Sequence, residues 1–369
     1  MAPDAPAESP QSAVTQSVPT ESAAPPPVVR RAAVVGCGDI SAQHFAAIEA
    51  VDGARLAAVV DPDPERLAKA ADAHGVPGYA TLGELLDAGE VDVVHLCTPH
   101  SEHAPLALEA LARGVHVLTE KPVAHTLADA EALVPATRKA FAERGVQFGV
   151  CFQNRYNATI RALRDLLEGG SLGRVLAANA TVMWHRTADY YAARPWRGTW
   201  EGSGGGLLMN QAIHTLDLLQ WLVGPATVVG GGASRRALEG VIEVEDTADI
   251  LLEHTREDGE SLRSVFYATN ANAVNSPVTL DIVTERAELS LRGVLTVRYA
   301  DGTIDIVEES GALPGERSYW GASHRLLIAD FYASLDSGVP FWIGADEATG
   351  ALRLIKDVYA RSFPEGGWL

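Results

Sequence analysis

The sequence predicts an α/β domain built on a parallel sheet, followed by an α+β domain with a large, mostly antiparallel open sheet. Short apolar runs alternate with helical segments up to about residue 151, which is the pattern of parallel strands joined by helical crossovers. Beyond that point one long helix is followed by a succession of strand-like runs, as in α+β units. A chain of 369 residues is also too long for one small core, which favours two domains.

The first 28 residues differ from the rest in composition. They are rich in Ala, Pro, Ser and Thr, and they lack the basic and apolar regions of a secretory signal. Such a segment cannot bury enough apolar surface to offset the entropy of ordering, so we expect a disordered tail over 1–28. The predicted domain boundaries are then 29–151 for the parallel α/β domain and 152–369 for the second domain.

Charge and cysteine content narrow the function classes. The formal net charge of −19 argues against binding to nucleic acid or to an anionic membrane surface, because either would require a basic face. No apolar run reaches the ~18 residues that a membrane span needs. Cys37, Cys97 and Cys151 lie far apart without the spacing of a metal site. We therefore expect no metal, and reduced thiols in a cytoplasmic protein.

The first strand leads into a dinucleotide-binding fingerprint, G-C-G-D-I-S at 36–41, which should open a helix. Gly36 allows the tight turn, and Gly38 lets the backbone approach a pyrophosphate at the helix N-terminus. Ser41 replaces the usual third glycine with another small residue. The second strand ends in Asp61, whose carboxylate would bind the adenosine ribose hydroxyls and repel the 2′-phosphate of NADP. The motif therefore predicts a Rossmann domain that binds NAD.

Strands and helices alternate through this first domain, and some of the strands deliver polar residues at their carboxyl ends. Thr98 and Pro99 follow one strand, and Glu120 and Lys121 follow the next. Open α/β sheets bind ligands at these ends, so we expect all four residues to line the cofactor crevice. We expect Ser101 to cap the helix that follows Pro99. The predicted strands are 32–35, 56–60, 91–96, 115–118 and 147–151, and the predicted helices are 41–50, 64–74, 82–87, 101–111 and 127–143.

The stretch G-V-H-V-L-T-E-K-P at 114–122 is the most informative of these strand ends. Proline there stops the strand and can introduce a cis peptide bond. An isolated E-K-P would indicate only a surface ion pair. Beside a dinucleotide motif, it is expected instead to deliver its two charges to the crevice where the sheet binds ligands.

A segment rich in aromatic and basic side chains follows a predicted strand at 175–183. Aromatic faces bury the apolar faces of sugar rings, while Arg, Tyr and His supply hydrogen bonds to hydroxyl groups. Some of these aromatic residues should instead pack the segment onto the sheet. The candidate substrate contacts in this segment, together with an arginine that precedes it, are Arg155, Trp184, Arg186, Tyr191, Trp196 and Arg197.

A single long helix is predicted over 207–222, after three consecutive glycines. Asn210, His214 and Asp217 recur in it at i, i+4 and i+7 and therefore share one face. A lone histidine there would most often be a hydrogen-bonded core residue. In a chain with a dinucleotide site and a strand-end lysine, this stripe can aim an acid-base group at a substrate.

Further strands and helices complete the predicted second domain. The strands are 228–232, 247–253, 262–267, 278–283, 287–291, 295–299 and 303–307, and the helices are 158–168, 324–335 and 345–359. They suit a large, mostly antiparallel open sheet.

Several of these motifs together resemble the Gfo/Idh/MocA oxidoreductases, the glucose-fructose oxidoreductase and inositol dehydrogenase family, over about residues 30–361. The matching pieces are V-V-G-C-G-D-I-S, the strand-end Asp61, T-E-K-P, W-R-G-T-W and G-G-G-L-L-M-N-Q-A-I-H-T-L-D. The resemblance implies that Lys121 orients the reacting hydroxyl and joins a proton relay, with His214 as the acid-base partner. Many members carry Asp four residues before this His, where this chain has Asn210. The resemblance also implies that the open sheet forms a subunit interface, giving a homodimer or homotetramer.

The predicted activity is NAD-dependent dehydrogenation of a secondary hydroxyl of a sugar, glycoside or cyclitol, with Lys121 and His214 catalytic. Two alternatives stay open: a glycosidase that uses bound NAD for transient oxidation and elimination, and a non-enzymatic NAD-bound sensor. Lys121, Asn210 and His214 join the candidate substrate contacts. The expected cofactor contacts are Gly36, Gly38, Asp39, Ile40, Asp61, Thr98, Pro99, His103, Glu120 and Lys121.

Overall fold

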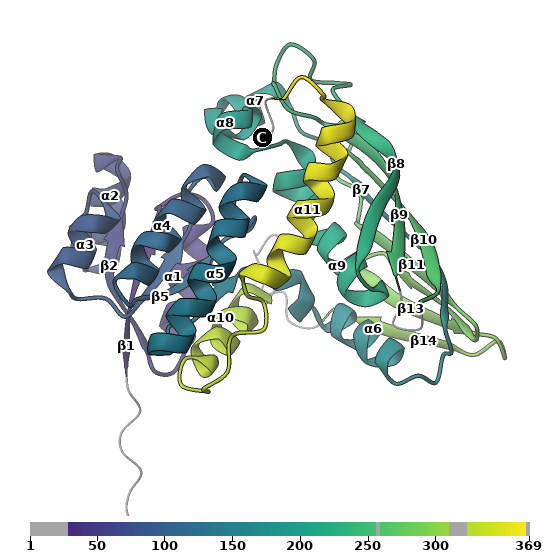
Figure 1. The fold of residues 1–369 in the computed structure, drawn as a ribbon, viewed down its shortest axis with the longest axis horizontal. Coiled ribbons are helices and arrows are strands. Elements are labelled where there is room, and N and C mark those ends of the chain that lie inside the picture. The colour runs from purple at the N-terminus through teal and green to yellow at the C-terminus, as the bar shows by residue number, and fades with distance from the viewer. Residues whose placement is uncertain (1–28, 256–258, 310–322, 367–369) are drawn as a thin grey trace, which may run out of the picture.

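The computed structural model describes residues 29–255, 259–309 and 323–366, so the tail expected over 1–28 lies outside the described residues. Two sheets dominate the molecule, and Figure 1 shows them on opposite sides of the long helix α11 (Ala345–Ser362). The predicted fold class is confirmed. The predicted boundary between residues 151 and 152 stays a prediction.

The first sheet is fully parallel and has six strands in the order β3-β2-β1-β4-β5-β6. The strand order reverses between β1 and β4, and ligands bind beyond the carboxyl ends of the strands at such a point. The strand β3 was not predicted, because two residues carry no readable pattern. The strands are β1 (Arg30–Val35), β2 (Ala54–Val60), β3 (Gly78–Tyr79), β4 (Val93–Leu96), β5 (His116–Thr119) and β6 (Phe148–Val150).

The helices of this part are α1 (Ser41–Ala50), α2 (Pro64–His74), α3 (Leu82–Ala88), α4 (His100–Ala112) and α5 (Leu127–Arg144). They cover the sheet, and residues such as Val34, Val94 and Leu118 are fully buried on its strands. The expectation that Ser101 caps α4 is wrong: the helix already includes His100, and Pro99 occupies the capping position without a side-chain hydrogen bond.

The second sheet has eight strands in the order β14-β13-β12-β11-β7-β10-β9-β8. Only β7 and β10 pair in parallel, so the sheet is mostly antiparallel, as predicted. The bounds are β7 (Val175–Met183), β8 (Ala226–Ser234), β9 (Thr247–Thr255), β10 (Ser261–Thr269), β11 (Thr279–Thr284), β12 (Ala287–Leu291), β13 (Val294–Tyr299) and β14 (Ile304–Glu308). Burial alternates along β10, so one face packs inward and the other is exposed.

Helices cover one face of this sheet, and Figure 1 shows the other face without any. The long helix predicted over 207–222 is divided: Leu208–Ala212 is a π-helix (η3), and α9 (Ile213–Val223) follows it. Single π turns inside helices occur frequently at functional sites. The remaining helices are η1 (Gln153–Tyr156), α6 (Ala158–Glu168), α7 (Ala188–Ala192), η2 (Pro195–Gly198), α8 (Trp200–Ser203) and α10 (Ser323–Ser334).

Two C-terminal helices connect the two sheets. The helix α10 packs on α1, and α11 packs on both α5 and β8. In Figure 1 the chain therefore returns to the parallel sheet after it has built the open one. None of the described helices is long and apolar enough to cross a lipid bilayer.

Candidate functional site

The glycine loop after β1 has the shape that a pyrophosphate requires. Gly36 has φ +91°, and a Cβ atom on it would lie 2.7 Å from the carbonyl oxygen of Cys97, so no other residue fits without strain. Open space surrounds the corresponding position at Gly38. A ligand can therefore approach the backbone at Gly38, next to the start of α1. Ile40 occupies the capping position of that helix.

Asp61 lies at the end of β2, where its carboxylate is buried. It accepts hydrogen bonds from the backbone N–H of Cys37 at 2.8 Å and of Asp63 at 2.9 Å. The Arg66 guanidinium also pairs with it at 3.1 Å. Arg66 was not predicted as a site residue, although a cation five residues after the strand-end acid, in the first turn of α2, was a readable signal.

The loops after β4 and β5 meet beside this crevice. The Thr98 hydroxyl is buried without a hydrogen-bond partner, so it fits a polar group of the cofactor. The Lys121–Pro122 peptide bond is cis. His103, an expected cofactor contact, instead places its two ring nitrogens 2.7 Å from the Pro122 carbonyl oxygen and 3.0 Å from that of Thr98. Both ring nitrogens thus face backbone carbonyl oxygens, one from each loop, and neither is left for a ligand.

Lys121 reaches from the end of β5 to the other half of the molecule. Its Nζ donates a hydrogen bond of 2.8 Å to the backbone carbonyl of Asn210, in the π-helix η3. Burial lowers the pKa of Lys121, Glu120 opposes the shift, and Arg197 adds to it. The amine is therefore easier to deprotonate than that of an exposed lysine.

His214 stands in the first turn of α9, beside the ring of Phe152. Burial, and then the positive charge of Lys121, hold its pKa well below the ordinary value, so the imidazole is neutral. Its Nδ1 is buried without a hydrogen-bond partner. The structure therefore brings together the two residues predicted to be catalytic, with a free imidazole nitrogen and an amine of lowered pKa.

The predicted polar stripe of Asn210, His214 and Asp217 does not act as one surface. The Asn210 side chain donates a hydrogen bond of 3.3 Å to the Tyr190 hydroxyl. The Asp217 carboxylate instead accepts two hydrogen bonds from the Arg155 guanidinium, at 2.6 and 2.8 Å. The π turn changes the register of Asn210 relative to the other two residues, because the i, i+4 rule holds only for an uninterrupted α-helix, whereas Asp217 is occupied by its ion pair. Arg155 and Asp217 form a buried ion pair.

Two arginines of the segment between β7 and α9 surround one tyrosine. The Arg186 and Arg197 guanidinium carbons lie 5.1 and 4.8 Å from the ring centre of Tyr190, within the range of cation–π attraction. The Nε atoms of both arginines are buried without a partner. These donors can serve an oxygen-rich ligand.

Other expected contacts in this segment have protein partners. Tyr191 is buried and accepts a hydrogen bond from Asn270 at 3.0 Å, while the neighbouring Tyr190 faces Asn210. The indole N–H of Trp184 donates to the Ser276 carbonyl at 3.2 Å, and the Trp196 ring contacts that of His100. Tyr190 was not among the predicted contacts, because two adjacent tyrosines give no signal in the sequence for which one points inward.

Asp39, in the glycine loop, faces the same segment. It pairs with Arg194 at 2.8 Å and with Arg197 at 3.5 Å. These ion pairs join the glycine loop of the parallel sheet to the segment that precedes the π-helix.

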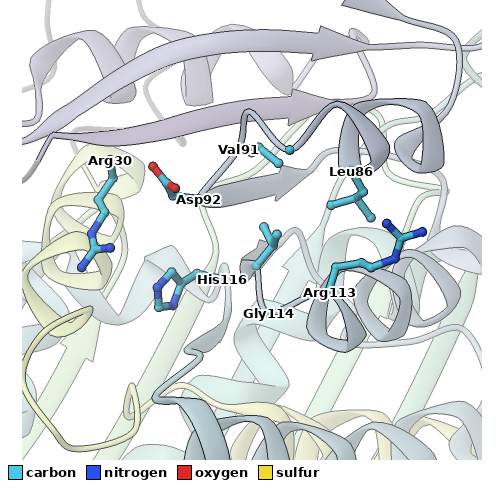
Figure 2. Close-up of a pocket in the computed structure, with 9 residues that line it drawn as sticks. Arg30, Leu86, Val91, Asp92, Arg113, Gly114 and His116 are labelled. Carbon is cyan, nitrogen blue, oxygen red and sulfur yellow. The ribbon is translucent and has the colours of Figure 1, made fainter.

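Two pockets lie apart from Lys121. Figure 2 shows the first, about 340 Å³, which is bordered by Arg30, Asp92 and His116 near the amino ends of β1, β4 and β5. Ligand sites of open parallel sheets lie at the opposite end, so this pocket is not the cofactor crevice. The second, about 930 Å³, is bordered by Arg155, Asp217 and residues of α6 and α9.

Comparison with known protein families accounts for most of the chain. Residues 30–150 match the oxidoreductase family with an NAD-binding Rossmann fold, and residues 160–290 match the GFO/IDH/MocA C-terminal domain. The chain belongs to the Gfo/Idh/MocA oxidoreductase family. The resemblance drawn from its motifs is therefore confirmed, as is NAD as the cofactor.

Individual relatives of this Gfo/Idh/MocA oxidoreductase include sugar and cyclitol dehydrogenases. A D-apiose dehydrogenase of Paraburkholderia graminis is 32% identical over 71% of this chain and 67% of its own length. An inositol 2-dehydrogenase of Saccharopolyspora erythraea is 32% identical over 72% and 75%. The WlbA dehydrogenase of Bordetella pertussis, solved with NADH and UDP-GlcNAcA, is 31% identical with a TM-score of 0.77, over 92% of this chain and 96% of that one.

The residues present fit NAD. The open backbone at Gly38 leaves room for a pyrophosphate, and the buried Asp61 carboxylate can accept hydrogen bonds from ribose hydroxyls. The Thr98 hydroxyl, which has no partner, can bind a further polar group of the cofactor. The Arg66 guanidinium pairs with the Asp61 carboxylate in this structure. The Arg66 side chain is 47% exposed, so it can move aside when the ribose binds.

Replacing Asp61 with Ser is expected to raise the affinity for NADPH relative to NADH by about tenfold to a hundredfold. The change removes a repelling carboxylate and frees Arg66 for the 2′-phosphate, and a charge-assisted hydrogen bond is worth about 1.5–3 kcal/mol. Fluorescence titration with both dinucleotides measures this without a substrate. The control is Asp61→Ser with Arg66→Ala, which should lose NADH affinity but gain little for NADPH. An unchanged ratio in Asp61→Ser would remove Asp61 from cofactor selection.

Proposed function

We propose that this oxidoreductase dehydrogenates a secondary hydroxyl group of a sugar, glycoside or cyclitol, with Lys121 as the base and His214 as its partner. The observation that carries the proposal is Lys121, an amine of lowered pKa held 2.8 Å from the Asn210 carbonyl, close to a neutral His214. Relatives that act on D-apiose and inositol support a polyhydroxylated substrate.

Bound NAD supplies the hydride acceptor. The protein must then orient the carbinol carbon and remove the hydroxyl proton. Lys121 in its neutral form can accept that proton, and the free Nδ1 of His214 can hydrogen-bond the same hydroxyl group. Asn210 is a neutral amide engaged with Tyr190, so it cannot hold an imidazolium by charge, and this favours Lys121 as the base.

Substrate hydroxyls next to the reacting one would be held by Arg186, Arg197 and Tyr190. The unpartnered Nε atoms of the two arginines are buried donors that need acceptors, and the aromatic ring between them can cover the apolar face of a sugar. Tyr190 replaces Tyr191 in this role, because the hydroxyl of Tyr191 is buried against Asn270.

A panel of sugars, glycosides and cyclitols, each supplied with NAD, tests the activity. We expect NADH absorbance to rise with at least one member, in proportion to enzyme. Cleavage of a glycoside without net NADH would instead indicate the redox-assisted glycosidase. If the protein binds NAD tightly but transforms no member of the panel, the result would favour the sensor.

Lys121→Ala and His214→Ala should each lower turnover by about two to four orders of magnitude, the usual contribution of a positioned acid-base group. The double variant should be little worse than the poorer single one, because the two residues serve one proton. Wild-type oxidation should speed up as pH rises through the lowered pKa of Lys121, because only the neutral amine accepts a proton.

The measurements for these variants are steady-state kinetics across pH and dinucleotide titration. The control is Lys139→Ala on α5, where the side chain is 73% exposed and turnover should not change. Near-normal turnover in Lys121→Ala would contradict its assignment as the base.

The exposed face of the open sheet supports a further part of the proposal, a homodimer or homotetramer. Val265 on β10 is 54% exposed and Leu176 on β7 is 49% exposed, on a sheet face that Figure 1 shows without helices. Exposed apolar side chains on an open sheet face favour a second copy of the chain as its cover. The three free cysteines also suit a reducing, cytoplasmic location, which alkylation of thiols in intact cells would check.

Val265→Glu should shift the protein toward monomers in light scattering, because the association would bury an unpaired charge. Val241→Glu is the matched control: Val241 is 51% exposed but lies outside the sheet, and its substitution should leave the mass unchanged. A wild-type protein that is already monomeric at micromolar concentration would contradict this interface.

A further inference from the structure

Arg186 lies between β7 and α7 and has no ion pair among the residues that the structure describes. Its Nη1 donates hydrogen bonds to the His185 carbonyl at 2.7 Å and to Oδ1 of Asn275 at 2.9 Å. The guanidinium carbon lies 4.9 Å from the ring centre of Trp184 and 5.1 Å from that of Tyr190. These contacts hold the guanidinium in place without neutralising its charge.

The opposite edge of this guanidinium has no protein partner. Nε is buried without a hydrogen bond, and Nη2 makes none within the described part of the chain. Nε and one Nη of an arginine donate two parallel hydrogen bonds, which match the two oxygens of a carboxylate. The chain uses this edge elsewhere, because Arg155 donates from Nε and Nη2 to the two oxygens of Asp217 at 2.8 and 2.6 Å. Arg186 therefore offers a pair of donors that fits a carboxylate from outside the chain.

A short series of contacts connects Arg186 with Lys121. The Tyr190 ring lies against the guanidinium, and its hydroxyl accepts hydrogen bonds from the Asn210 and Gln211 amides at 3.3 and 3.1 Å. The backbone carbonyl of Asn210 in turn accepts the hydrogen bond from Lys121. A molecule with its reacting hydroxyl at Lys121 can therefore place a more distant group at Arg186.

The charge around this segment is positive. Arg197 lies 3.5 Å from Asp39, a carboxylate that pairs more closely with Arg194, at 2.8 Å. The positive charge of Arg197 adds to the effect of burial in lowering the pKa of Lys121, so its field reaches the amine. One carboxylate thus serves two of these arginines and none pairs with Arg186. A local excess of positive charge in a chain of net charge −19 favours an anionic ligand.

We propose that the substrate is a sugar acid, whose carboxylate is bound by Nε and Nη2 of Arg186 while its hydroxyl group reacts at Lys121. The inference rests on the proposed function and narrows its substrate class to uronic and aldonic acids. A hydroxyl group matches the two parallel donors less well, because it offers one oxygen and no charge.

The cofactor is the other source of anionic oxygens near this segment. Arg194 and Arg197 contact Asp39 in the glycine loop, and therefore lie on the side of the pyrophosphate. Arg186 is instead hydrogen-bonded to Asn275, and it follows directly on the end of β7 in the second sheet. This position favours the substrate over the cofactor as the ligand of Arg186.

Matched sugars test the inference: glucose with glucuronate and gluconate, and galactose with galacturonate, each supplied with NAD. We expect kcat/KM for the acids to exceed that for their neutral counterparts by about tenfold or more. Arg186→Gln should lower this acid-to-neutral ratio by about tenfold to a hundredfold, mainly through KM, which is the usual contribution of a charge-assisted hydrogen bond.

Two further variants serve as controls. Arg138→Gln on α5 removes a guanidinium whose side chain is 67% exposed, and it should leave the ratio unchanged. Arg186→Lys keeps the positive charge but loses the two parallel donors, so it should restore the ratio only in part.

Binding is measured separately, so that the inference does not depend on turnover. Calorimetric titration of the NADH-bound protein with each acid should give a Kd that rises about tenfold or more in Arg186→Gln, while the Kd for NADH stays the same. If no sugar is oxidised, the proposed function fails, but acid binding that depends on Arg186 would still support the carboxylate site.

Three results would overturn the sugar acid as substrate. The first is an equal kcat/KM for acids and neutral counterparts, which would leave the dehydrogenase itself standing. The second is a weaker affinity of Arg186→Gln for NADH, which would assign the arginine to the cofactor phosphates. The third is acid binding that is absent, or that is the same in wild type and in Arg186→Gln.

Discussion

The site depends on the hydrogen bond from Lys121 to the Asn210 carbonyl. This bond connects the loop after β5 of the parallel sheet with the π-helix η3 of the second part, at the proposed catalytic residues. One partner stands at the end of a buried parallel strand and the other in a π-helix of the second part. The strand end cannot move without breaking the packing around the buried Leu118. The His103 ring lies between the loop after β5 and the loop after β4, with its nitrogens close to the carbonyl oxygens of Pro122 and Thr98. A lysine held at both ends in this way is positioned before any substrate arrives, which is what acid-base catalysis requires.

Burial of charge explains the composition of the surrounding cluster. An isolated carboxylate in the interior would be very costly, so Glu120 persists only because imidazole and backbone donors surround it. The same burial keeps His44, His95 and His214 neutral, and it weakens the hold of Lys121 on its proton. One physical effect therefore leaves more of the lysine in the neutral form that can accept a proton, and it keeps the surrounding imidazoles uncharged. The open sheet plays no part in this chemistry beyond carrying η3 and α9.

The site was predictable where function depends on position along a strand. Gly36, Asp61 and Lys121 each follow a buried parallel strand, and strand ends of one sheet must meet at one edge. The prediction failed where a side chain could turn either way. Tyr191 rather than Tyr190 was expected to contact the substrate, and Asp217 was expected to share one face with Asn210 and His214 but pairs with Arg155. A single π turn leaves no periodic trace in the sequence, because it changes the helical register only once.

The sequence by itself determined the order of strands and helices, the dinucleotide fingerprint and the family, because these depend on local periodicity and on residues close together in the chain. Only the tertiary structure decided which side chains meet. The hydrogen-bonded side chains of His44, His95, Glu120 and Tyr332 come from four segments, the first and last of them 288 positions apart (332 minus 44), and nothing in their local sequence relates them. Arg66 could have been inferred from its nearness to Asp61, but contacts such as Arg197 with Asp39 depend on how two separately formed layers pack. Pairings between distant segments follow from the burial of whole surfaces, and a one-dimensional pattern does not contain that information.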